Sequence, residues 1–460
     1  MVTTSKLSIA TASILLLLIS CVTNNTSETS GPQHPLEAYA DSIFQANVDS
    51  GYIAGAAVIV FQGDEYLVNK SYGFASLELS TPIPENASFE IGSITKQFTS
   101  AAILRLVEAG KLSLEDDFTK YVPFDTRGRT VTINHLLNHT SGIPGYTELP
   151  FFRNFSIEKH ERDSLVRIIE KEEFLFEPGS AMIYNNSGYF LLGLVIEAAA
   201  GKTYEEYLSE QFFQPLGMEN TYYCSETKVF SGKVYGYNYA EKGLHQKPYL
   251  DHTWPFAAGS LCSTTKDLLV WMQALHGGKV FQEETYKLLT TPGTLNDGSL
   301  LRYAMGVTNM NNFGNHVIGH GGGINGFLSY SGYFTDADMF IICLVNTTGP
   351  KGAYFFADNL IWKNIEKKEA TGVPLDFDLK ILEGKYSGAV RGRTLNVEIK
   401  ALQGAVSITS AGRDGNEIVD TLKTYIGDYT WMEDNTIVII KNGEYRRDMV
   451  NGYYILKRME

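Results

Sequence analysis

Hydrophobic and polar residues follow two different periods along the chain, and the changes of period divide it into segments. An apolar stripe with helical spacing predicts a helix over residues 36–50. Alternating and apolar positions on either side of a Gly-Asp pair predict a β-hairpin over residues 54–68. Helical patterns dominate residues 93–220. Strand patterns return within residues 326–346 and are followed by a helical pattern over residues 353–367.

This order of elements predicts a fold class. Strands come first, a long helical insertion follows, and strands and a helix close the segment of residues 36–367. Such an order favours one α+β unit, whose sheet takes strands from both ends of the segment.

The pattern changes again after residue 367. Residues 368–381 contain Gly372 and Pro374 and are typical of a linker. Residues 382–460 then show short alternating strands, among them 395–399 and 436–440, separated by turn-forming pairs such as Asn442-Gly443. We therefore expect a separate small β-barrel or sandwich at the C-terminal end.

The first residues have the composition of an export signal. Lys6 precedes an apolar run over residues 7–19, which is shorter than the roughly 20 residues that a membrane-spanning helix needs. The run ends in Leu-Ile-Ser and Cys21, and this resembles the lipobox of bacterial lipoproteins, in which the cysteine is acylated. The alternative is an ordinary signal peptide with a chance cysteine. We expect a signal over residues 1–20, a flexible tether over residues 21–35, and an exported protein with a lipid anchor in the bacterial cell envelope, in the periplasm.

Composition narrows the function classes. The 460 residues are 44% hydrophobic and 20% charged, as in ordinary globular proteins, and the net charge is −14. An acidic chain of this kind is a poor candidate for nucleic-acid binding, which needs a basic surface. Besides Cys21 there are three cysteines: Cys343 lies in an apolar strand pattern that predicts a core position, and the sequence leaves open whether Cys224 and Cys262 pair.

Common catalytic signatures are missing, which directs attention to a Ser-x-x-Lys pattern. The nucleophile elbow of α/β-hydrolases and the His-Glu-x-x-His zinc motif do not occur in the sequence. Gly201-Lys202-Thr203 resembles the end of a phosphate loop, but Ile196 stands where the first glycine of such a loop is required. We therefore interpret Gly201 as a helix C-cap. Ser-x-x-Lys occurs four times, beginning at residues 93, 156, 225 and 263.

The surroundings distinguish the pair Ser93 and Lys96 from the other three pairs. A mostly apolar helical stretch follows this pair, so Lys96 is expected on a buried helix, on the same face of its first turn as Ser93. Burial lowers the pKa of a lysine, and a helix N-terminus favours negative charge on a nearby oxygen. Both effects suit an activated serine nucleophile. The other three pairs lie in polar segments and are expected to be surface residues.

Two further segments carry candidate chemistry. Tyr184 and Asn186 form the sole Tyr-x-Asn of the chain, after a Pro-Gly turn and before an apolar helix pattern. His320 opens a glycine-rich run in which Gly322 and Gly323 would allow a ligand to approach the backbone closely. Taken singly, the first segment is also compatible with core packing and the second with a flexible turn.

In combination, the three segments resemble the motifs of the superfamily of serine β-lactamases and penicillin-binding proteins. Ser93-x-x-Lys96 matches the first motif, Tyr184-x-Asn186 the second, and His320-Gly321-Gly322 the third, in this order. The resemblance covers about residues 36–367 and is greatest to the branch of class C β-lactamases, D-alanyl-D-alanine carboxypeptidases and related esterases. It implies an antiparallel sheet flanked by helices and an all-helical lobe, with the site between them.

The resemblance also implies roles for these residues. Ser93 is expected to form an acyl-enzyme, with Lys96 maintaining the proton network and Tyr184 acting as base and then as acid. Asn186 is expected to hold the acyl amide of the substrate, and the backbone N–H groups of Ser93 and Gly323, next to Gly322, to form the oxyanion hole. His320 replaces the third-motif lysine and is expected to bind the substrate carboxylate or to transfer a proton.

Histidine at position 320 and the added β-domain decide between branches of the superfamily. Both are more typical of carboxypeptidase-like and esterase-like relatives than of dedicated β-lactamases. We therefore expect a hydrolase of D-amino-acid peptides or esters, with β-lactam acylation as a side activity, and with no metal or organic cofactor. The alternative is a non-catalytic receptor for penicillin or peptidoglycan fragments, or a structural module, on the same fold.

Overall fold

The structure is a computed structural model that describes residues 34–460 except residues 226, 242, 434 and 460. The predicted signal over residues 1–20, Cys21 and nearly all of the tether lie outside the described residues, so the lipid anchor stays a prediction. The residues from His34 to the C-terminus cluster into one unit. In this described part, every helix is too short or too polar to cross a membrane.

The central element is a seven-stranded antiparallel sheet with the strand order β10-β11-β12-β13-β1-β2-β3. Strand β1 from the start of the chain pairs with β13 from the far end of the domain, with Ile59 opposite Ile342. The prediction of one α+β unit with strands from both ends is therefore confirmed. The strands are β1 (Gly55–Gln62), β2 (Glu65–Ser76), β3 (Thr81–Pro82), β10 (Thr308–Asn312), β11 (Asn315–Ile324), β12 (Phe327–Phe334) and β13 (Met339–Val345).

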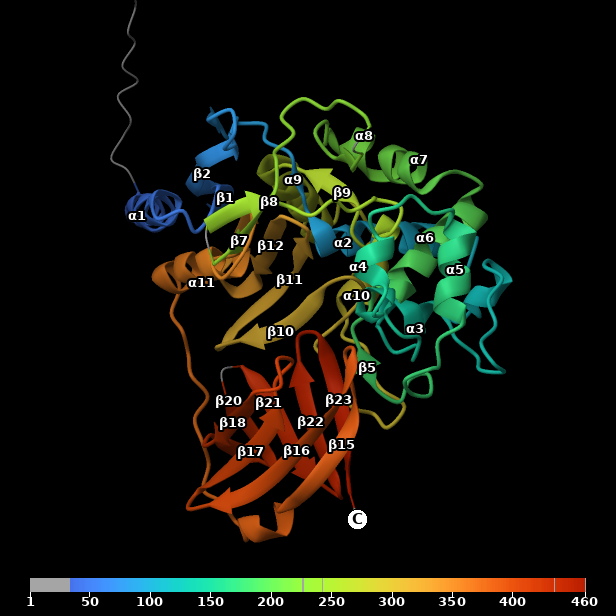
Figure 1. The fold of residues 1–460 in the computed structure, drawn as a ribbon, viewed down its shortest axis with the longest axis vertical. Helices are drawn as coiled ribbons and strands as arrows, with labels where there is room; N and C mark the ends of the chain where they lie inside the picture. The colour runs from blue at the N-terminus through green and yellow to red at the C-terminus, as the bar shows by residue number, and fades with distance from the viewer. Residues whose placement is uncertain (1–33, 226, 242, 434, 460) are drawn as a thin grey trace, which may run out of the picture. The chain divides into compact units, whose positions relative to one another are not determined.

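Helices cover both faces of this sheet, which explains why β1 and β13 are apolar at nearly every position (Figure 1). Helices α1 (Pro35–Asp49) and α11 (Ala353–Asn364) pack on the face that carries Val58 and Cys343. Helices α2 (Thr95–Glu108) and α9 (Thr265–His276) lie on the other face, in the larger core of the protein. Because successive side chains of a strand point to opposite faces, one strand contributes to both cores.

A helical lobe extends the larger core. Helix α6 (Asn186–Ala200) crosses it and is buried along most of its length, and it ends at Gly201 with a φ of 67°, which confirms the predicted C-cap. The remaining α-helices here are α3 (Ile133–Leu137), α4 (Phe152–Phe155), α5 (Arg162–Glu170), α7 (Tyr204–Leu208), α8 (Gln214–Leu216) and α10 (Glu283–Thr290).

Two three-stranded sheets accompany the seven-stranded sheet. One has the order β4-β9-β6, and next to it Cys224 and Cys262 form a disulfide, which answers the question that the sequence left open. Cys343 is buried and free, as predicted. The strands of the two sheets are β4 (Phe89–Glu90), β6 (Tyr222–Tyr223) and β9 (Leu261–Ser263), then β7 (Tyr237–Ala240), β8 (Gly243–Gln246) and β14 (Thr347–Thr348).

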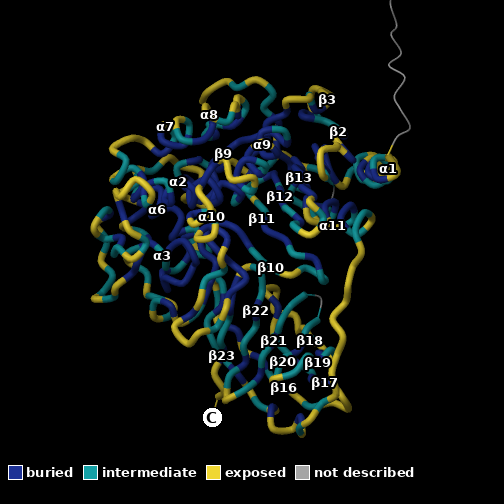
Figure 2. The backbone as a smooth tube through the Cα atoms, turned by 180° about the vertical axis from the view of Figure 1, so that it is seen from behind, coloured by how far each residue is buried: buried dark blue, intermediate teal, exposed yellow. Residues whose placement is uncertain are grey.

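The C-terminal segment forms a nearly closed antiparallel β-domain with a core of its own around Trp431, Val406 and Leu456. An exposed linker over residues 366–374 leads to it (Figure 2). Its strands are β15 (Gly384–Val390), β16 (Arg393–Leu402), β17 (Ala405–Ala411), β18 (Glu417–Leu422), β19 (Tyr425–Gly427), β20 (Thr430–Glu433), β21 (Thr436–Lys441), β22 (Glu444–Met449) and β23 (Gly452–Arg458).

The C-terminal domain also pairs with the larger domain through its last strand. Strand β23 also pairs with β5 (Met182–Ile183) of the larger domain, with Gly452 opposite Ile183. The sheet of the C-terminal domain therefore continues into the segment directly before Tyr184. Sequence patterns miss this contact because β5 has two residues, too few for a recognisable alternation.

Candidate active site

Ser93 and Lys96 lie where the chain turns into helix α2. Ser93 is in a 3-10 turn, Gly92–Ile94, and Lys96 is in the first turn of the helix. Nζ of Lys96 is 3.0 Å from Oγ of Ser93, so the predicted pair is in direct contact. Helix α2 is apolar on nearly all sides because the larger core surrounds it, and Lys96 is consequently 0% exposed.

The neighbours of Lys96 determine what its amine can do. Nζ lies 2.9 Å from Oδ1 of Asn186 and 2.7 Å from the carbonyl oxygen of Ala258, and both of these atoms only accept hydrogen bonds. Burial lowers the pKa of Lys96 well below its ordinary value, and the positive charge of Arg391 lowers it further. A neutral amine that donates to these two oxygens keeps its lone pair for the hydroxyl proton of Ser93.

Tyr184 lies between β5 and α6, and Asn186 is the first residue of α6. Asn185 caps the helix by accepting a hydrogen bond from the backbone N–H of Gly188, and this fixes Asn186 as the first helical residue. The ring of Tyr184 lies 4.9 Å from Nζ of Lys96. Its hydroxyl makes no hydrogen bond within the described residues, although Ser93 is close enough to lower its pKa. Burial has the larger effect and raises the pKa of Tyr184, so the phenol stays protonated.

His320 lies on strand β11, and the glycine-rich run after it continues this strand instead of forming a loop. Nδ1 of His320 is 2.5 Å from the carbonyl oxygen of Gly321 and therefore carries the proton, so Nε2 accepts a hydrogen bond from the hydroxyl of Tyr303 at 3.0 Å. Burial lowers the pKa of His320 to about 3. The imidazole is thus neutral near pH 7, and both of its nitrogens have partners within the protein.

Glycine is required where the turn before Ser93 meets β11. Gly92 has a φ of +51°, and a Cβ atom there would lie 2.8 Å from the backbone nitrogen of Gly323. A Cβ atom on Gly322 would lie 2.0 Å from the carbonyl oxygen of Ile91. This close packing brings the backbone of Gly323 next to that of Ser93, as an oxyanion hole requires.

The predicted site residues lie around one cavity of about 260 Å³. Ser93, Tyr184, Asn186, His320, Gly322 and Gly323 all line it. Lys96 contacts Ser93 from the protein interior.

Sequence reasoning missed three residues of this cavity that come from the β-domain: Arg391, Val450 and Asn451. The guanidinium of Arg391 lies 5.2 Å from the ring centroid of Tyr184 and forms an ion pair with Glu148 at 2.7 Å. The carbonyl oxygen of Asn451 accepts a hydrogen bond from the backbone N–H of Tyr184 at 3.3 Å. No short motif marks such residues, because they lie more than 200 residues after Tyr184 along the chain.

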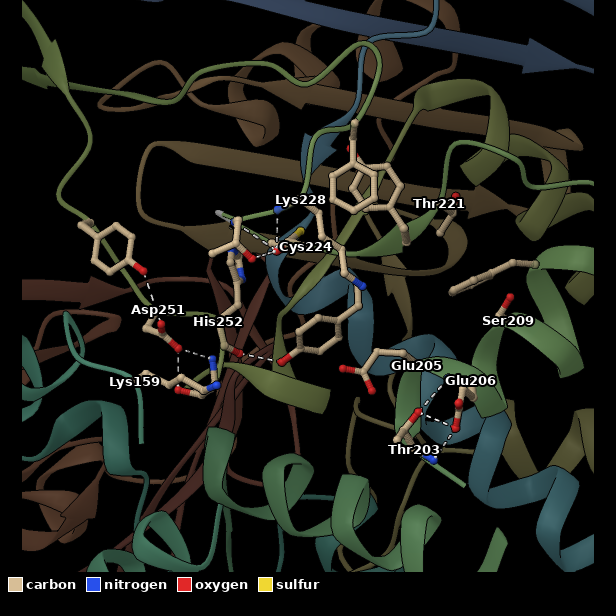
Figure 3. A pocket seen from close by; sticks show the side chains of 18 residues that line it. Lys159, Thr203, Glu205, Glu206, Ser209, Thr221, Cys224, Lys228, Asp251 and His252 are labelled. Atoms are coloured by element: carbon tan, nitrogen blue, oxygen red, sulfur yellow. Dashed lines mark hydrogen bonds between the residues drawn. The ribbon is translucent and has the colours of Figure 1, made fainter. Parts of the chain in front are cut away.

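The other Ser-x-x-Lys pairs do not form comparable sites. Oγ of Ser225 accepts a hydrogen bond from the backbone N–H of Lys228, and Lys266 forms an ion pair with Glu85. Lys159 and Lys228 line a second cavity of about 650 Å³ beside the Cys224–Cys262 disulfide (Figure 3). Ser93, Lys96, Tyr184, Asn186 and His320 are all absent from its lining.

A buried lysine against a serine, between an antiparallel sheet and a helical lobe, defines a serine hydrolase of the penicillin-binding type. The profile of the family described as Beta-lactamase matches residues 40–363. The chain belongs to this family.

Curated relatives agree with this assignment. Penicillin-binding protein 4* of Bacillus subtilis (strain 168) is 30% identical over 315 residues, which span 63% of this chain and 67% of that protein. Protein flp of Staphylococcus aureus (strain MRSA252) is 27% identical over 300 residues, 63% of this chain. The chain spans 59% of the length of that second relative.

Solved structures share the fold. The octameric penicillin-binding protein homologue from Pyrococcus abyssi has a TM-score of 0.63 and 24% identity, and the likeness covers 91% of this chain and 99% of that one. This coverage exceeds residues 40–363, so the likeness in fold extends into the β-domain. A D-stereospecific amidohydrolase from Streptomyces sp. has a TM-score of 0.59 and 25% identity, with 69% and 95% of the two chains covered.

Proposed function

We propose that the protein hydrolyses D-amino-acid peptides, amides or small esters through an acyl-enzyme on Ser93, as D-alanyl-D-alanine carboxypeptidases and related esterases do, and that penicillins acylate the same serine. The contact between Oγ of Ser93 and the buried amine of Lys96 carries this proposal. The names of the relatives, a penicillin-binding protein and a D-stereospecific amidohydrolase, support the substrate class.

Acylation begins with transfer of the Ser93 hydroxyl proton to Nζ of Lys96 as Oγ attacks the substrate carbonyl. Lys96 fits the role of base better than Tyr184, because burial favours the neutral amine and also the neutral phenol. The backbone N–H groups of Ser93 and Gly323 stabilise the negative charge that develops on the carbonyl oxygen.

Collapse of the tetrahedral intermediate needs a proton for the leaving group. Tyr184 lines the cavity, and its buried hydroxyl makes no hydrogen bond among the described residues, so it donates this proton and recovers one from Lys96. Water then attacks the acyl-enzyme and gives a proton to Lys96. As the bond between the acyl group and Oγ breaks, Lys96 returns this proton to Oγ of Ser93. Asn186 orients the acyl group, since Oδ1 of Asn186 is held by Lys96.

The test is acylation followed by intact-protein mass spectrometry. Wild type incubated with a fluorescent penicillin and with p-nitrophenyl esters is expected to gain the mass of one acyl group, located on Ser93 by peptide mapping. Ser93→Ala is expected to gain none and to lose about 10⁶-fold in turnover. Ser225→Ala, which removes the serine of another Ser-x-x-Lys pair, serves as the matched control and keeps full activity. Equal residual rates in wild type and Ser93→Ala would end the proposal.

A further inference from the structure

A groove of about 890 Å³ lies between the larger domain and the β-domain, next to the catalytic cavity. One wall is formed by residues 147–157, from the loop before α4 and from α4 itself. The other wall includes the turn between β15 and β16, with Arg391 and Arg393, and Arg413 after β17.

The charge of the groove is opposite to that of the protein. Four arginines line it, namely Arg153, Arg391, Arg393 and Arg413, and among the described residues of its lining only Glu148 is acidic. The chain as a whole has a net charge of −14. A positive groove in an acidic protein attracts anions selectively, because the surrounding surface repels them.

Most of this positive charge has no carboxylate partner. Glu148 pairs with Arg391. Within the described residues, Arg393 and Arg413 donate to backbone carbonyl oxygens, of Ala411 and Arg391 respectively, and form no ion pair. The guanidinium of Arg153 has neither a carbonyl nor a carboxylate partner among the described residues. Three guanidinium groups are therefore available to a bound anion, and guanidinium suits carboxylates through its paired N–H donors.

The groove continues from the reacting centre. Arg391 lines both the groove and the cavity that contains Ser93. Thr147, also in the groove wall, accepts a hydrogen bond from Nδ2 of Asn186 at 3.2 Å. Because Asn186 is the residue proposed to orient the acyl group, an acyl chain that leaves Ser93 on this side enters the groove.

We propose that the groove is the acyl-chain subsite of the enzyme and that it selects acyl donors whose chain carries a carboxylate away from the scissile bond, such as acidic peptides. This inference rests on the proposed acyl-enzyme chemistry at Ser93. It gives the β-domain a role in substrate choice, since Arg391, Arg393 and Arg413 all belong to it.

The test compares two substrates with the same leaving group. Mono-p-nitrophenyl adipate ends in a carboxylate, and its methyl ester is neutral, so both release p-nitrophenol from an equivalent reacting centre. Wild type is expected to show a higher kcat/KM for the acid. Arg153→Gln/Arg393→Gln is expected to lower kcat/KM for the acid about tenfold and to change that for the methyl ester less than about twofold, because exposed ion pairs contribute modestly. Added salt is expected to reduce the preference.

Lys400→Gln/Lys441→Gln is the matched control, since it also removes two cations of the β-domain, from positions that do not line the groove. If wild type hydrolyses both esters through Ser93 at equal kcat/KM, or if the groove variant behaves like this control, the inference is wrong while the proposed function stands. If wild type hydrolyses neither ester and Ser93 gains no acyl group, the proposed function fails, and the inference fails with it.

Discussion

The cavity that contains Ser93 and the groove next to it form one active-site cleft, since Arg391 lines both. The two walls of this cleft, one from each domain, differ in burial and charge. The wall that contains Lys96, Tyr184 and His320 is nearly closed to solvent, and its ionisable groups are held in their neutral forms. The β-domain forms the other wall, where Arg391 lines the cavity itself and Arg413 lines the adjoining groove. Both are cationic, and Arg391 is partly buried while Arg413 is exposed.

This difference separates two tasks. Proton transfer at Ser93 benefits from a site closed to water, where burial lowers the pKa of the Lys96 amine well below its ordinary value. Selection of a charged substrate benefits from groups that keep their charge and remain accessible. One cleft provides both environments because a second domain closes it. We first consider a change that weakens the attachment of the β-domain, and then a change in the packing of the backbone next to Ser93.

The largest effect is expected at a buried ion pair that joins the two domains. Nε of Arg302, before β10, donates to Asp448 of β22 at 2.8 Å, and both side chains are largely buried. Arg302→Met leaves the Asp448 carboxylate without its partner, and we expect a loss of about 3 kcal/mol, measured as a lower urea midpoint. The double variant Arg302→Met/Asp448→Leu is expected to recover most of this loss.

The pH dependence of this loss has a defined sign. Burial raises the pKa of Asp448 to about 6, although the positive charge of Arg302 lowers it in part. Below that pH the carboxyl is protonated with or without Arg302, and above it the variant must either keep a proton at a cost or bury a charge. The difference in urea midpoint between wild type and Arg302→Met should therefore grow as the pH rises through about 6. A difference that shrinks over this range would show that the pair does not hold the domains together.

A smaller effect is expected in the neutral wall. Gly92→Ala introduces a Cβ atom 2.8 Å from the backbone nitrogen of Gly323 and should displace the oxyanion hole, lowering kcat about tenfold. Gly128→Ala is the matched control, because Gly128 also has a positive φ, +78°, but has open space around its missing Cβ. Both variants should lose some thermal stability from backbone strain. If they lose equal activity, the contact with Gly323 has no part in catalysis.

The two walls also differ in what the sequence predicts about them. Ser93-x-x-Lys96 and Tyr184-x-Asn186 are local patterns next to helix starts. A spacing of three places Ser93 and Lys96 on one turn, and Tyr184-x-Asn186 is recognised by its position between a Pro-Gly turn and an apolar helix pattern. The strand run around Ile342 likewise predicts a buried strand, and the structure confirms it.

The contributions of the β-domain could not be predicted in this way. Arg391 reaches the cavity because β23 pairs with the two-residue strand β5, and neither the pairing nor its register has a local signature. The tautomer of His320 could not be predicted from the sequence either, because it is fixed by the hydroxyl of Tyr303 and the carbonyl oxygen of Gly321.

The central claim is that Lys96 acts as an uncharged base for Ser93, and the pH profile of acylation tests it most directly. The burst of p-nitrophenol from p-nitrophenyl acetate gives the acylation rate from about pH 5 to about pH 10. Because the charged amine cannot accept the proton, the rate should fall as the pH drops below the pKa of Lys96 and should reach a plateau well below 10.5, the ordinary pKa of lysine. Lys96→Met should lose roughly 10³-fold in rate, together with this inflection. A wild-type rate that keeps rising past that ordinary pKa, or an unchanged profile in Lys96→Met, would contradict the account.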